Sequence, residues 1–368
     1  MDFGRDFGHT PVMSTTQRLP ASLTPLDVAL AALLRDLGMV APRWDARPDA
    51  PPPALAEVPE LKAWPSHDVA AVDGWALSAS DLVGASSFTP LPLSRLPVWV
   101  EAGDRMPDGC DCVIDEDAID LMGPIAQALS EAIPGQGVRR KSGAIADASR
   151  IAGAWRPGDL RHAGLRLRVV NVPGGAVTAK LIACGLREAG IKVMFVEAAT
   201  RDAASVAGLL DGSGCDLLIT IGGGGVGRTD ATVIALAERG EVIAHGLALQ
   251  PGRTAAVGRI ARTPVIALPG APDQALAVWW ALVLPVLDRL SGRQTQPTAT
   301  LSLARKIASS VGIAEVVLLE RQGDGWMPLS VGDLPFAMIA RADAWLLVPG
   351  GSEGHAAGTP VNAYMLRE

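Results

Sequence analysis

The spacing of hydrophobic and polar residues changes along the chain and predicts three kinds of segment. Between residues 69 and 138 the apolar stretches are short and separated by turn signals, as where Pro107-Asp108-Gly109 stands between Val98–Val100 and Cys112–Ile114. Short strands joined by tight turns are typical of a small β-rich domain. From residue 298 onward short strand-like stretches return, which predicts a second, C-terminal β domain. Its expected strands are 315–319, Ala344–Val348 and 361–365.

Between these two parts, strand-like and helix-like stretches alternate. The expected strands are 169–172, 191–196, Leu217–Ile221 and 265–268, and the expected helices are 176–189, 202–210, 231–239 and 272–290. Such alternation predicts a mostly parallel sheet with helices on both faces. The predicted fold class is therefore α/β with additional β domains: a multidomain chain with a central, mostly parallel sheet and a small C-terminal all-β domain.

The N-terminal part carries weaker signals. Residues 1–22 have no periodicity and are expected to form a flexible arm. Apolar residues then recur at helical spacing over 26–34, with Thr24 as a plausible N-cap and Pro25 at the first helical position. The run PDAPPP at 48–53 is expected to be a linker or turn cluster. The expected division is an N-terminal arm (1–22), a linker or helical domain in two pieces (23–68 and 137–166), a small β-rich domain (69–136), an α/β domain (167–295) and a C-terminal β domain (296–368).

Composition and charge narrow the possible functions. Hydrophobic residues make up 49% of the 368 residues, and 32 basic and 39 acidic residues give a net charge of -7. A modestly acidic chain without a long basic run is a poor binder of nucleic acid or anionic membranes. The most apolar stretch, 275–287, is short and contains Pro285, which is typical of a buried helix rather than a membrane span. The N-terminus has no apolar core like that of a signal peptide.

The cysteines and histidines do not suggest a metal centre. Four cysteines, two of them in the lone C-x-C of Cys110 and Cys112, are too few and too scattered for a disulfide framework. No second pair or nearby histidine completes a zinc site, and the histidines are dispersed along the chain. Reduced thiols fit a cytoplasmic protein.

One glycine-rich run offers a candidate ligand loop. Five of the six residues from Gly222 to Gly227 are glycine: Gly222, Gly223, Gly224, Gly225 and Gly227. The run follows an expected strand and precedes an expected helix, where loops of a parallel sheet bind ligands. It lacks the Gly-Lys-Ser/Thr ending of a P-loop, and any glycine-rich run contains the dinucleotide pattern by chance. It is therefore either a cradle whose backbone N–H groups approach an anion or a tight, closely packed turn.

Asp230 and two further loops extend this candidate site. Asp230 stands at the start of the next expected helix, where it is either a helix cap or a ligand of Mg²⁺, which proteins hold with one or two carboxylates plus substrate phosphates. The turn Gln250-Pro251-Gly252-Arg253 offers a cation for a phosphate or oxyanion. The loop Pro269-Gly270-Ala271-Pro272 runs from a strand into a helix. All three loops are expected at one edge of the sheet.

Several ordered motifs resemble those of molybdopterin molybdenumtransferase, the enzyme family that includes the E domain of gephyrin. The glycine run is similar to the family pattern S-G-G-V-S-V-G-x-x-D-x-T, with Asp230 and Thr232 at its end. Gln250-Pro251-Gly252-Arg253-Thr254 resembles K-P-G-K-P, and 268–274 resembles L-P-G-N-P-V-S. Upstream, Ala71-Val72-Asp73-Gly74-Trp75-Ala76 resembles A-M-D-G-Y-A, and 102–114 resembles T-G-A-P-x-P-x-G-A-D-x-V-V. The similarity covers residues 24 to 368 in order.

This resemblance implies an elongated homodimer whose α/β domain binds molybdopterin. The pterin arrives in adenylated form, and molybdate is inserted with Mg²⁺-dependent release of AMP. The resemblance gives Asp73 and Asp230 the catalytic and metal-binding roles, and it places them on opposite sides of a subunit interface. The implied cofactor-binding residues are Gly222, Gly223, Gly224, Gly225, Gly227, Thr232, Pro251, Gly252, Arg253, Pro269, Gly270 and Pro272.

The sequence departs from the family where side chains would bind the oxyanion. Gly225 and Gln274 replace two serines, Gln250 and Arg253 replace two lysines, and Asp273 adds a negative charge nearby. Each lost charge-assisted contact weakens anion binding by on the order of 1.5–3 kcal/mol. Gly143 and Ala144 stand where the family has acids, and the family's T-G-D-E-L and D-S-N segment is missing after Val172. The backbone cradle is unaffected by these changes.

Two functions therefore stay open, with a third less favoured. The first is an enzyme that inserts molybdate, with Asp73 and Asp230 handling Mg²⁺ and Arg253 the anion. The second is a non-catalytic carrier or chaperone of molybdopterin that hands the cofactor to a partner protein of the same pathway. An unrelated nucleotide-dependent enzyme is disfavoured because the P-loop lysine is missing. Arg139 and Arg140 either meet a phosphate at the domain junction or form a solvated basic pair.

Overall fold

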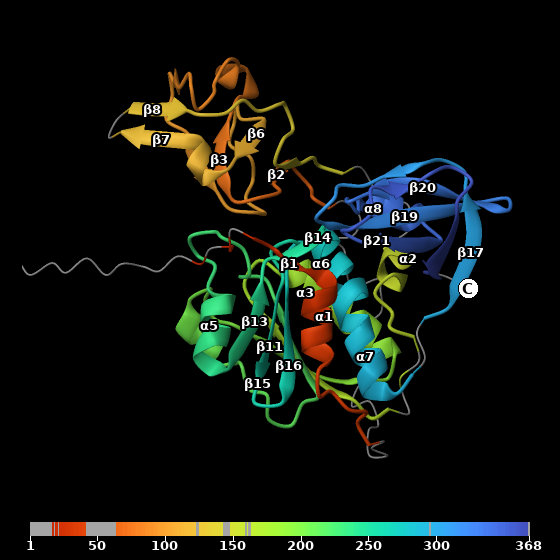
Figure 1. Ribbon diagram of the computed structural model, residues 1–368. Helices are drawn as coiled ribbons and strands as arrows, with labels where there is room; N and C mark the ends of the chain where they lie inside the picture. Colours follow the sequence, from red (N-terminus) through yellow and green to blue (C-terminus); the bar gives the residue numbers. More distant parts are fainter. Residues whose placement is uncertain are drawn as a thin grey trace, which may run out of the picture.

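The computed structural model describes residues 17, 19–20, 22–41, 64–122, 125–142, 148–158, 160, 163–293 and 296–366. The α/β domain lies in the middle, the small β domain lies above one end of it, and the C-terminal domain lies beside it (Figure 1). The expected turn cluster at 48–53 and the altered positions Gly143 and Ala144 lie outside the described residues. Within the described part of the chain, no helix is long and apolar enough to cross a membrane.

A six-stranded sheet forms the α/β domain. Its strands are β10 (Arg166–Asn171), β11 (Lys192–Glu197), β12 (Leu217–Ile221), β13 (Glu241–His245), β15 (Ala256–Ile260) and β16 (Thr263–Leu268), in the order β11-β10-β12-β16-β15-β13. The first four strands in this order are parallel, and β15 and β13 add an antiparallel edge. The predicted parallel sheet is confirmed, but the antiparallel edge was not predicted.

Helices cover both faces of this sheet. Alternate residues of its strands are buried against the helices on one face and on the other. The helices are α3 (Ala176–Glu188), α4 (Ala203–Ala207), α5 (Thr232–Arg239) and the continuous run α6 (Pro272–Val278), η5 (Trp279–Val283) and α7 (Leu284–Ser291). Leu217, Ile219 and Ile221 of β12 pack into the core shared with α3, α6 and α7. Leu218 faces the opposite core with α4 and α5. The expected helix at 272–290 contains an unexpected π-helical segment, η5.

The N-terminal segment is tied to this domain. Strand β1 (Thr24–Pro25) pairs in parallel with β14 (Leu247–Gln250), and helix α1 (Leu26–Leu34) follows. Pro25, not Thr24, precedes the first helical residue. Within the segment expected to be a flexible arm, 1–22, Gln17 is only 5% exposed. Most of that arm lies outside the described residues.

The small β domain consists of short sheets, as predicted. Its elements are β3 (Gly74–Leu77), η3 (Ala79–Leu82), β4 (Leu91–Pro92), β5 (Val98–Val100), β6 (Cys112–Ile114), η4 (Glu116–Ala118), β7 (Ile119–Met122) and β8 (Ile125–Ala128). The strand orders are β5-β3-β6 and β4-β8-β7. A Cβ on Gly74 would lie 2.2 Å from the carbonyl oxygen of Ile114, so only glycine lets β3 approach β6 directly after Asp73.

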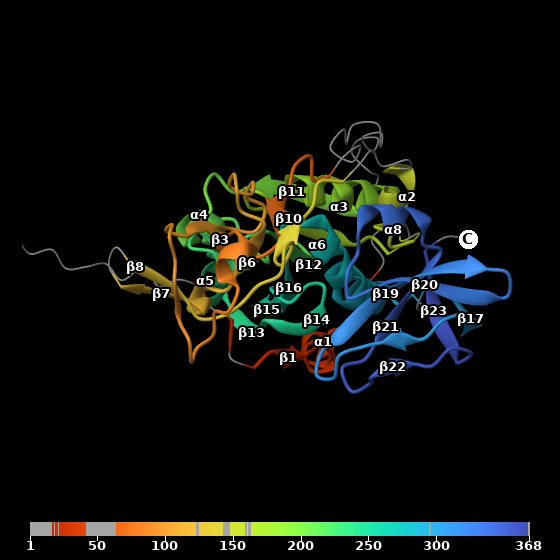
Figure 2. The same cartoon turned by 90° about the horizontal axis from the view of Figure 1, so that it is seen from above.

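Two short strands connect the small β domain to the rest. Strand β2 (Val69–Ala70) pairs with β9 (Val138–Arg139), so the chain enters and leaves the domain side by side. The turned view places the small β domain over the sheet end that carries α4 and α5 (Figure 2). Helix α2 (Ala148–Gly153) then leads back toward the α/β domain.

The C-terminal domain is a curled sheet. Its elements are β17 (Thr298–Leu303), β18 (Ile307–Ala308), β19 (Ala314–Gln322), β20 (Gly325–Val331), α8 (Phe336–Arg341), β21 (Ala344–Val348), β22 (Gly354–His355) and β23 (Pro360–Met365). The sheet order is β1-β14-β19-β20-β17-β23-β21, and the additional pairing of β21 with β19 closes five strands on one another. The short helix α8 lies between β20 and β21 in the chain, and its buried residues Phe336 and Ile339 belong to the core of the α/β domain. Strand β14 joins this sheet to the loop that begins at Pro251.

Candidate functional site

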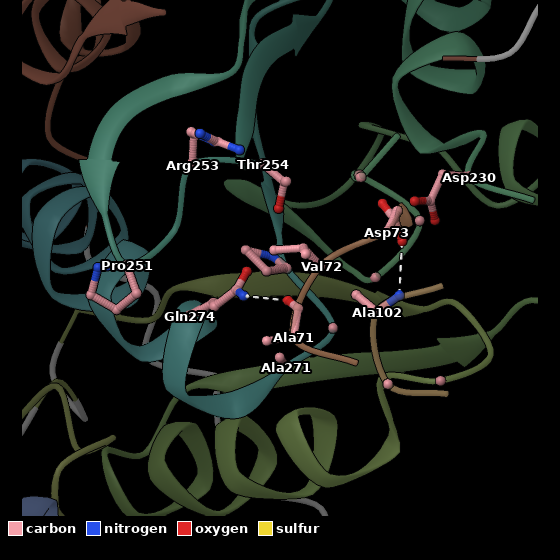
Figure 3. Close-up of a pocket in the computed structure, with 18 of the residues that line it drawn as sticks. Ala71, Val72, Asp73, Ala102, Asp230, Pro251, Arg253, Thr254, Ala271 and Gln274 are labelled. Carbon is pink, nitrogen blue, oxygen red and sulfur yellow. Dashed lines mark hydrogen bonds between the residues drawn. The ribbon is translucent and has the colours of Figure 1, made fainter. Parts of the chain in front are cut away.

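A cavity of about 480 Å³ lies where the small β domain meets the carboxyl ends of the parallel strands. All three loops expected from the sequence line it, together with the Asp73 segment (Figure 3). The predicted binding residues that line it are Gly222, Gly223, Gly224, Gly225, Pro251, Gly252, Arg253, Pro269, Gly270 and Pro272. The glycine loop and the Pro269 loop follow the parallel strands β12 and β16, whose carboxyl ends lie at one edge of the sheet. The Pro251 loop follows β14 of the C-terminal sheet.

The glycine loop turns sharply at its start. Gly222 and Gly223 adopt φ values of 87° and 68°, in the left-handed region that favours glycine. Thr232, at the start of α5, is buried and holds this turn: its Oγ1 donates to the carbonyl of Gly222 and its N–H donates to that of Gly223. Thr232 therefore shapes the loop, and neither Thr232 nor Gly227 is among the residues that line the cavity.

Asp73 and Asp230 face one another across the glycine loop (Figure 3). The two oxygens of Asp73 accept hydrogen bonds from the N–H groups of Ala102, at 2.8 Å, and Val226, at 3.1 Å. Asp230 accepts from the N–H of Gly227 at 3.1 Å and from the Arg201 guanidinium at 2.6 Å. Both acids belong to one chain in this structure, whereas the resemblance implied that they meet between subunits.

Burial and mutual repulsion change the acidity of this pair. Burial and the negative charge of Asp73 together raise the pKa of Asp230 to about 6, against the lowering effect of Arg201 and of the Gly227 N–H. Burial also raises the pKa of Asp73, against the lowering effect of the N–H groups of Ala102 and Val226. Two carboxyl groups that repel each other in a desolvated place are stabilised by a cation between them.

The acid pair fits a Mg²⁺ ion that is shared with a substrate. Oxygen ligands suit Mg²⁺, which is commonly held by one or two carboxylates, phosphate oxygens and water. Each carboxylate oxygen of Asp73 and Asp230 accepts one protein hydrogen bond and keeps a second lone pair. Among the described residues, no group of three or more His, Cys, Asp or Glu is arranged to hold a metal ion by itself. The remaining ligands would have to come from substrate and water.

Arg201 and Glu101 are site residues that the sequence reading missed. Arg201 follows β11, so its place at the carboxyl edge of the sheet was predictable from topology. Its guanidinium lies 2.6 Å from Asp230 and 3.8 Å from Glu101. Glu101 directly precedes the segment that resembles the family motif, and it accepts hydrogen bonds from the N–H and the hydroxyl of Thr229.

A cation–π contact also joins the small β domain to the segment after the glycine loop. The Arg228 guanidinium lies 4.5 Å from the ring centre of Trp99 and 5.7 Å from that of Trp75. Arg228 directly follows the glycine loop in the chain, and both tryptophans lie in the small β domain. The two domains therefore meet through Arg228 and Thr229 on one side and Trp99 and Glu101 on the other.

The remaining two loops form the opposite side of the cavity. Arg253 is exposed, and among the described residues its guanidinium has no ion-pair partner, so it is available to an anion. Gln274, which stands where the family has a serine, donates to the carbonyl of Ala71 at 3.4 Å and thus links the α6 end to the Asp73 segment. Arg253 and the acid pair lie on different sides of the cavity in Figure 3.

The negative charge that Asp273 adds near the site is paired with Arg139. Arg139 donates to Asp273 through Nε and Nη2, at 3.1 and 2.6 Å, and their side chains are only 15% and 7% exposed. The Arg139 guanidinium also lies 5.0 Å from the ring centre of Trp64. Arg140 instead pairs with Asp68 near the surface. Of the two arginines, Arg139 is therefore structural at the domain junction and not a solvated charge.

Two protein-family models match parts of the chain. Residues 56–164 match the model of the MoeA N-terminal region (domain I and II), and residues 176–289 match the model of a probable molybdopterin binding domain. The first match contains the small β domain and Asp73. The second contains the glycine loop, Asp230 and the two further cavity loops.

Curated relatives match most of the chain at low identity. A putative molybdopterin biosynthesis protein of Methanocaldococcus jannaschii is 23% identical, over 82% of this chain and 86% of its own length. Molybdopterin molybdenumtransferase 2 of Mycobacterium tuberculosis is 27% identical, over 62% of this chain and 70% of its own length. Among solved structures, a molybdopterin biosynthesis MoeA protein of Pyrococcus horikoshii aligns over 94% of this chain and all of its own, with 20% identity and a TM-score of 0.49.

Proposed function

From the premise that this chain belongs to the molybdopterin molybdenumtransferase (MoeA) family and acts in molybdenum cofactor biosynthesis, we propose that it inserts molybdate into molybdopterin. The substrate is adenylated molybdopterin, and the products are the molybdenum-loaded pterin and AMP. The observation that carries the proposal is the single cavity that holds the acid pair, the glycine loop and Arg253 together.

The proposed reaction has two balanced parts. Water cleaves the phosphoanhydride bond of the adenylate, so the pterin keeps one phosphate and AMP leaves with the other. The two dithiolene sulfurs displace one oxygen of molybdate, which departs as water with the two thiol protons. Bound Mg²⁺ would neutralise the phosphate charges as the anhydride bond breaks.

The residues of this chain divide these tasks by their position. Asp73 and Asp230 would hold Mg²⁺, which would supply the positive charge for the substrate phosphates. The N–H groups of the glycine loop would donate to an anion without hindrance from side chains. Arg253, on the other side of the cavity, binds molybdate or a second anionic group. Arg201 donates to the Asp230 carboxylate at 2.6 Å. Its positive charge therefore offsets the negative charge of Asp230 before substrate binds.

A second candidate function, a carrier that binds molybdopterin without turnover, is favoured by one observation. Each carboxylate oxygen of the acid pair already has a donor within the protein, and Arg201 supplies a positive charge at Asp230. A resting site that is satisfied in this way can bind a pterin without taking up a metal ion. In this case the chain would hand the cofactor to a partner enzyme of the pathway.

Nucleotide release distinguishes the two functions. Purified protein is mixed with adenylated molybdopterin, Mg²⁺ and molybdate, and AMP is followed by chromatography while protein-bound molybdenum is measured. Multiple turnovers of AMP for each chain support the transferase. Stoichiometric pterin binding with no AMP above the protein-free control supports the carrier and contradicts the transferase.

The family resemblance also supports a cytoplasmic homodimer as the working form. The contacts that carry the acid pair lie within one chain, so a second copy is not required to complete that pair. Light scattering at working concentration measures the state of assembly, and the variant mixing described in the Discussion measures whether subunits share the site.

A further inference from the structure

Gln17, which precedes β1 in the chain, contacts the glycine loop. The residue is 5% exposed, although it lies in a segment that has no helical or strand periodicity. Its Nε2 donates to the carbonyl of Gly223 at 3.2 Å and to that of Gly225 at 2.6 Å. Its Oε1 accepts from the N–H of Val233, in the first turn of α5, at 2.9 Å. The whole amide is therefore used on backbone groups of the loop and of the helix after it.

The carbonyl between these two is held in the same way by another side chain. His245, at the end of β13, lies with Nε2 3.0 Å from the carbonyl oxygen of Gly224. Thr232 donates to the carbonyl of Gly222. Four successive carbonyl groups of the loop, from Gly222 to Gly225, are thus each held by a side chain of the protein.

Holding the carbonyl groups determines where the N–H groups of the loop point. In a planar trans peptide the C=O of one residue and the N–H of the next point in opposite directions. The carbonyl of Gly225 bonds Gln17, and the N–H of Val226 in the same peptide donates to Asp73, a residue that lines the cavity. The carbonyls of Gly223 and Gly224 are held likewise, so the N–H groups of Gly224 and Gly225 point away from Gln17 and His245. Among the described residues, no acceptor takes these two N–H groups.

We infer that Gln17 is a positioning residue that orients the glycine loop to donate hydrogen bonds to an oxyanion group of the ligand. The donors are the N–H groups of Gly224 and Gly225, which remain after the family's serines are replaced. Leu19, two residues further along the arm, lines the same cavity. Gln17 and Leu19 are therefore part of the binding site. Without the hydrogen bonds of Gln17, a loop of consecutive glycines would lose its order before binding. The oxyanion is assigned to molybdopterin phosphate, which rests on the proposed function.

The test compares Gln17→Glu and Gln17→Ala with wild type. Glutamate keeps the size of the side chain, but when ionised it cannot donate to the carbonyls of Gly223 and Gly225. Two readouts are measured: hydrogen exchange of the backbone amides at 222–227 in the ligand-free protein, and binding of molybdopterin by tryptophan fluorescence. Gln322→Glu, at an exposed position in the C-terminal domain, is the matched control. Removal of residues 1–16 is a second control, because it keeps Gln17.

In both Gln17 variants the backbone amides at 222–227 are expected to exchange hydrogen faster than in wild type. The variants should also bind molybdopterin about tenfold more weakly, because each removes a buried hydrogen-bond donor that serves two carbonyl groups. The controls and the exchange rates of β10 and β12 are expected to match wild type. Unchanged exchange at 222–227 together with unchanged binding overturns the inference. Faster exchange throughout the chain also overturns it, because Gln17 would then support overall stability only. If wild type itself does not bind molybdopterin, the proposed function fails, and the exchange comparison still decides the role of Gln17.

Discussion

A Cβ atom on Gly225 would lie 2.5 Å from Oδ2 of Asp230. The same Cβ would lie 3.0 Å from Oδ2 of Asp73, so the two acids close over a position that has room for hydrogen only. The family pattern that this run resembles has a serine at that position. The glycine is therefore not only a lost hydroxyl donor: it permits the close approach of the acid pair to the loop.

Restoring the serine is expected to disturb the acid pair. Gly225→Ser should lower the free energy of unfolding by about 1–3 kcal/mol, because one or both buried carboxylates must move. Gly351→Ser is the matched control, since a Cβ at Gly351 meets no atom within 4 Å. Denaturant unfolding of both variants measures the difference. Equal stability of Gly225→Ser and wild type would show that the acids do not lie against this glycine.

The raised pKa of Asp230 predicts a specific pH dependence. The folded protein holds this proton up to about pH 6, whereas a carboxyl with the ordinary value of 3.8 releases it earlier. The folded state therefore binds more protons than the unfolded chain between these values, and stability falls as the pH rises through them. Relative to Asp230→Asn, wild type should lose on the order of 1–3 kcal/mol between pH 4 and pH 6. Parallel stability curves for the two proteins would contradict this account.

The ion pair at the domain junction should contribute strongly to stability. Arg139→Ala leaves the buried Asp273 carboxylate without its partner, and the expected loss is about 3–5 kcal/mol of unfolding free energy. Arg140→Ala breaks the pair with Asp68, where the arginine side chain is 57% exposed, and should cost less than about 1 kcal/mol. Thermal and denaturant unfolding compare the two arginine variants. A similar effect of both would mean that the Arg139 pair is hydrated.

Mixing inactive variants tests whether one chain supplies both acids. Asp73→Ala and Asp230→Ala proteins are unfolded together, refolded together and assayed for AMP release. The hydrogen bonds that join the Asp73 segment to the glycine loop lie within one chain, so the mixture should be no more active than either variant alone. Activity that appears only in the mixture would assign the two acids to different subunits.

The predictable part of the fold is the part with strong periodicity. The parallel strands and the helices between them were predicted because β12, buried on both faces, reads as a continuous apolar run. Strand β13 was missed because only one of its five residues is buried and it begins with the polar Glu241. Strand β15 was missed because Gly258 and Arg259 interrupt its apolar run, although its first three residues are buried. Helix α8 was missed because it has six residues, too few for a helical period to appear.

The parts of the site that backbone motifs form could be predicted from the sequence. Contacts between side chains far apart along the chain could not. The glycine loop and the Pro269 loop follow neighbouring parallel strands, so their convergence follows from sheet topology. The Pro251 loop follows β14 of the C-terminal sheet, so its place at the cavity does not follow from that topology. The pairing of Asp273 with Arg139 joins residues 134 positions apart, and Gln17 reaches the glycine loop across more than 200 positions. Neither contact has a local sequence signal. Arg201 could have been identified, since it lies in the loop after the parallel strand β11, which ends at Glu197.

The most direct test of the central claim compares wild type with Asp230→Asn on adenylated molybdopterin. Asparagine keeps the shape of the side chain but removes the charge that would hold a cation. With Mg²⁺ and molybdate present, wild type should release AMP, whereas Asp230→Asn should bind the substrate and release AMP at least about 100-fold more slowly, as expected when charge stabilisation of the reacting phosphates is lost. Equal rates of AMP release, or no release by wild type while it binds the substrate tightly, would contradict the proposal that the acid pair makes this protein a molybdenumtransferase.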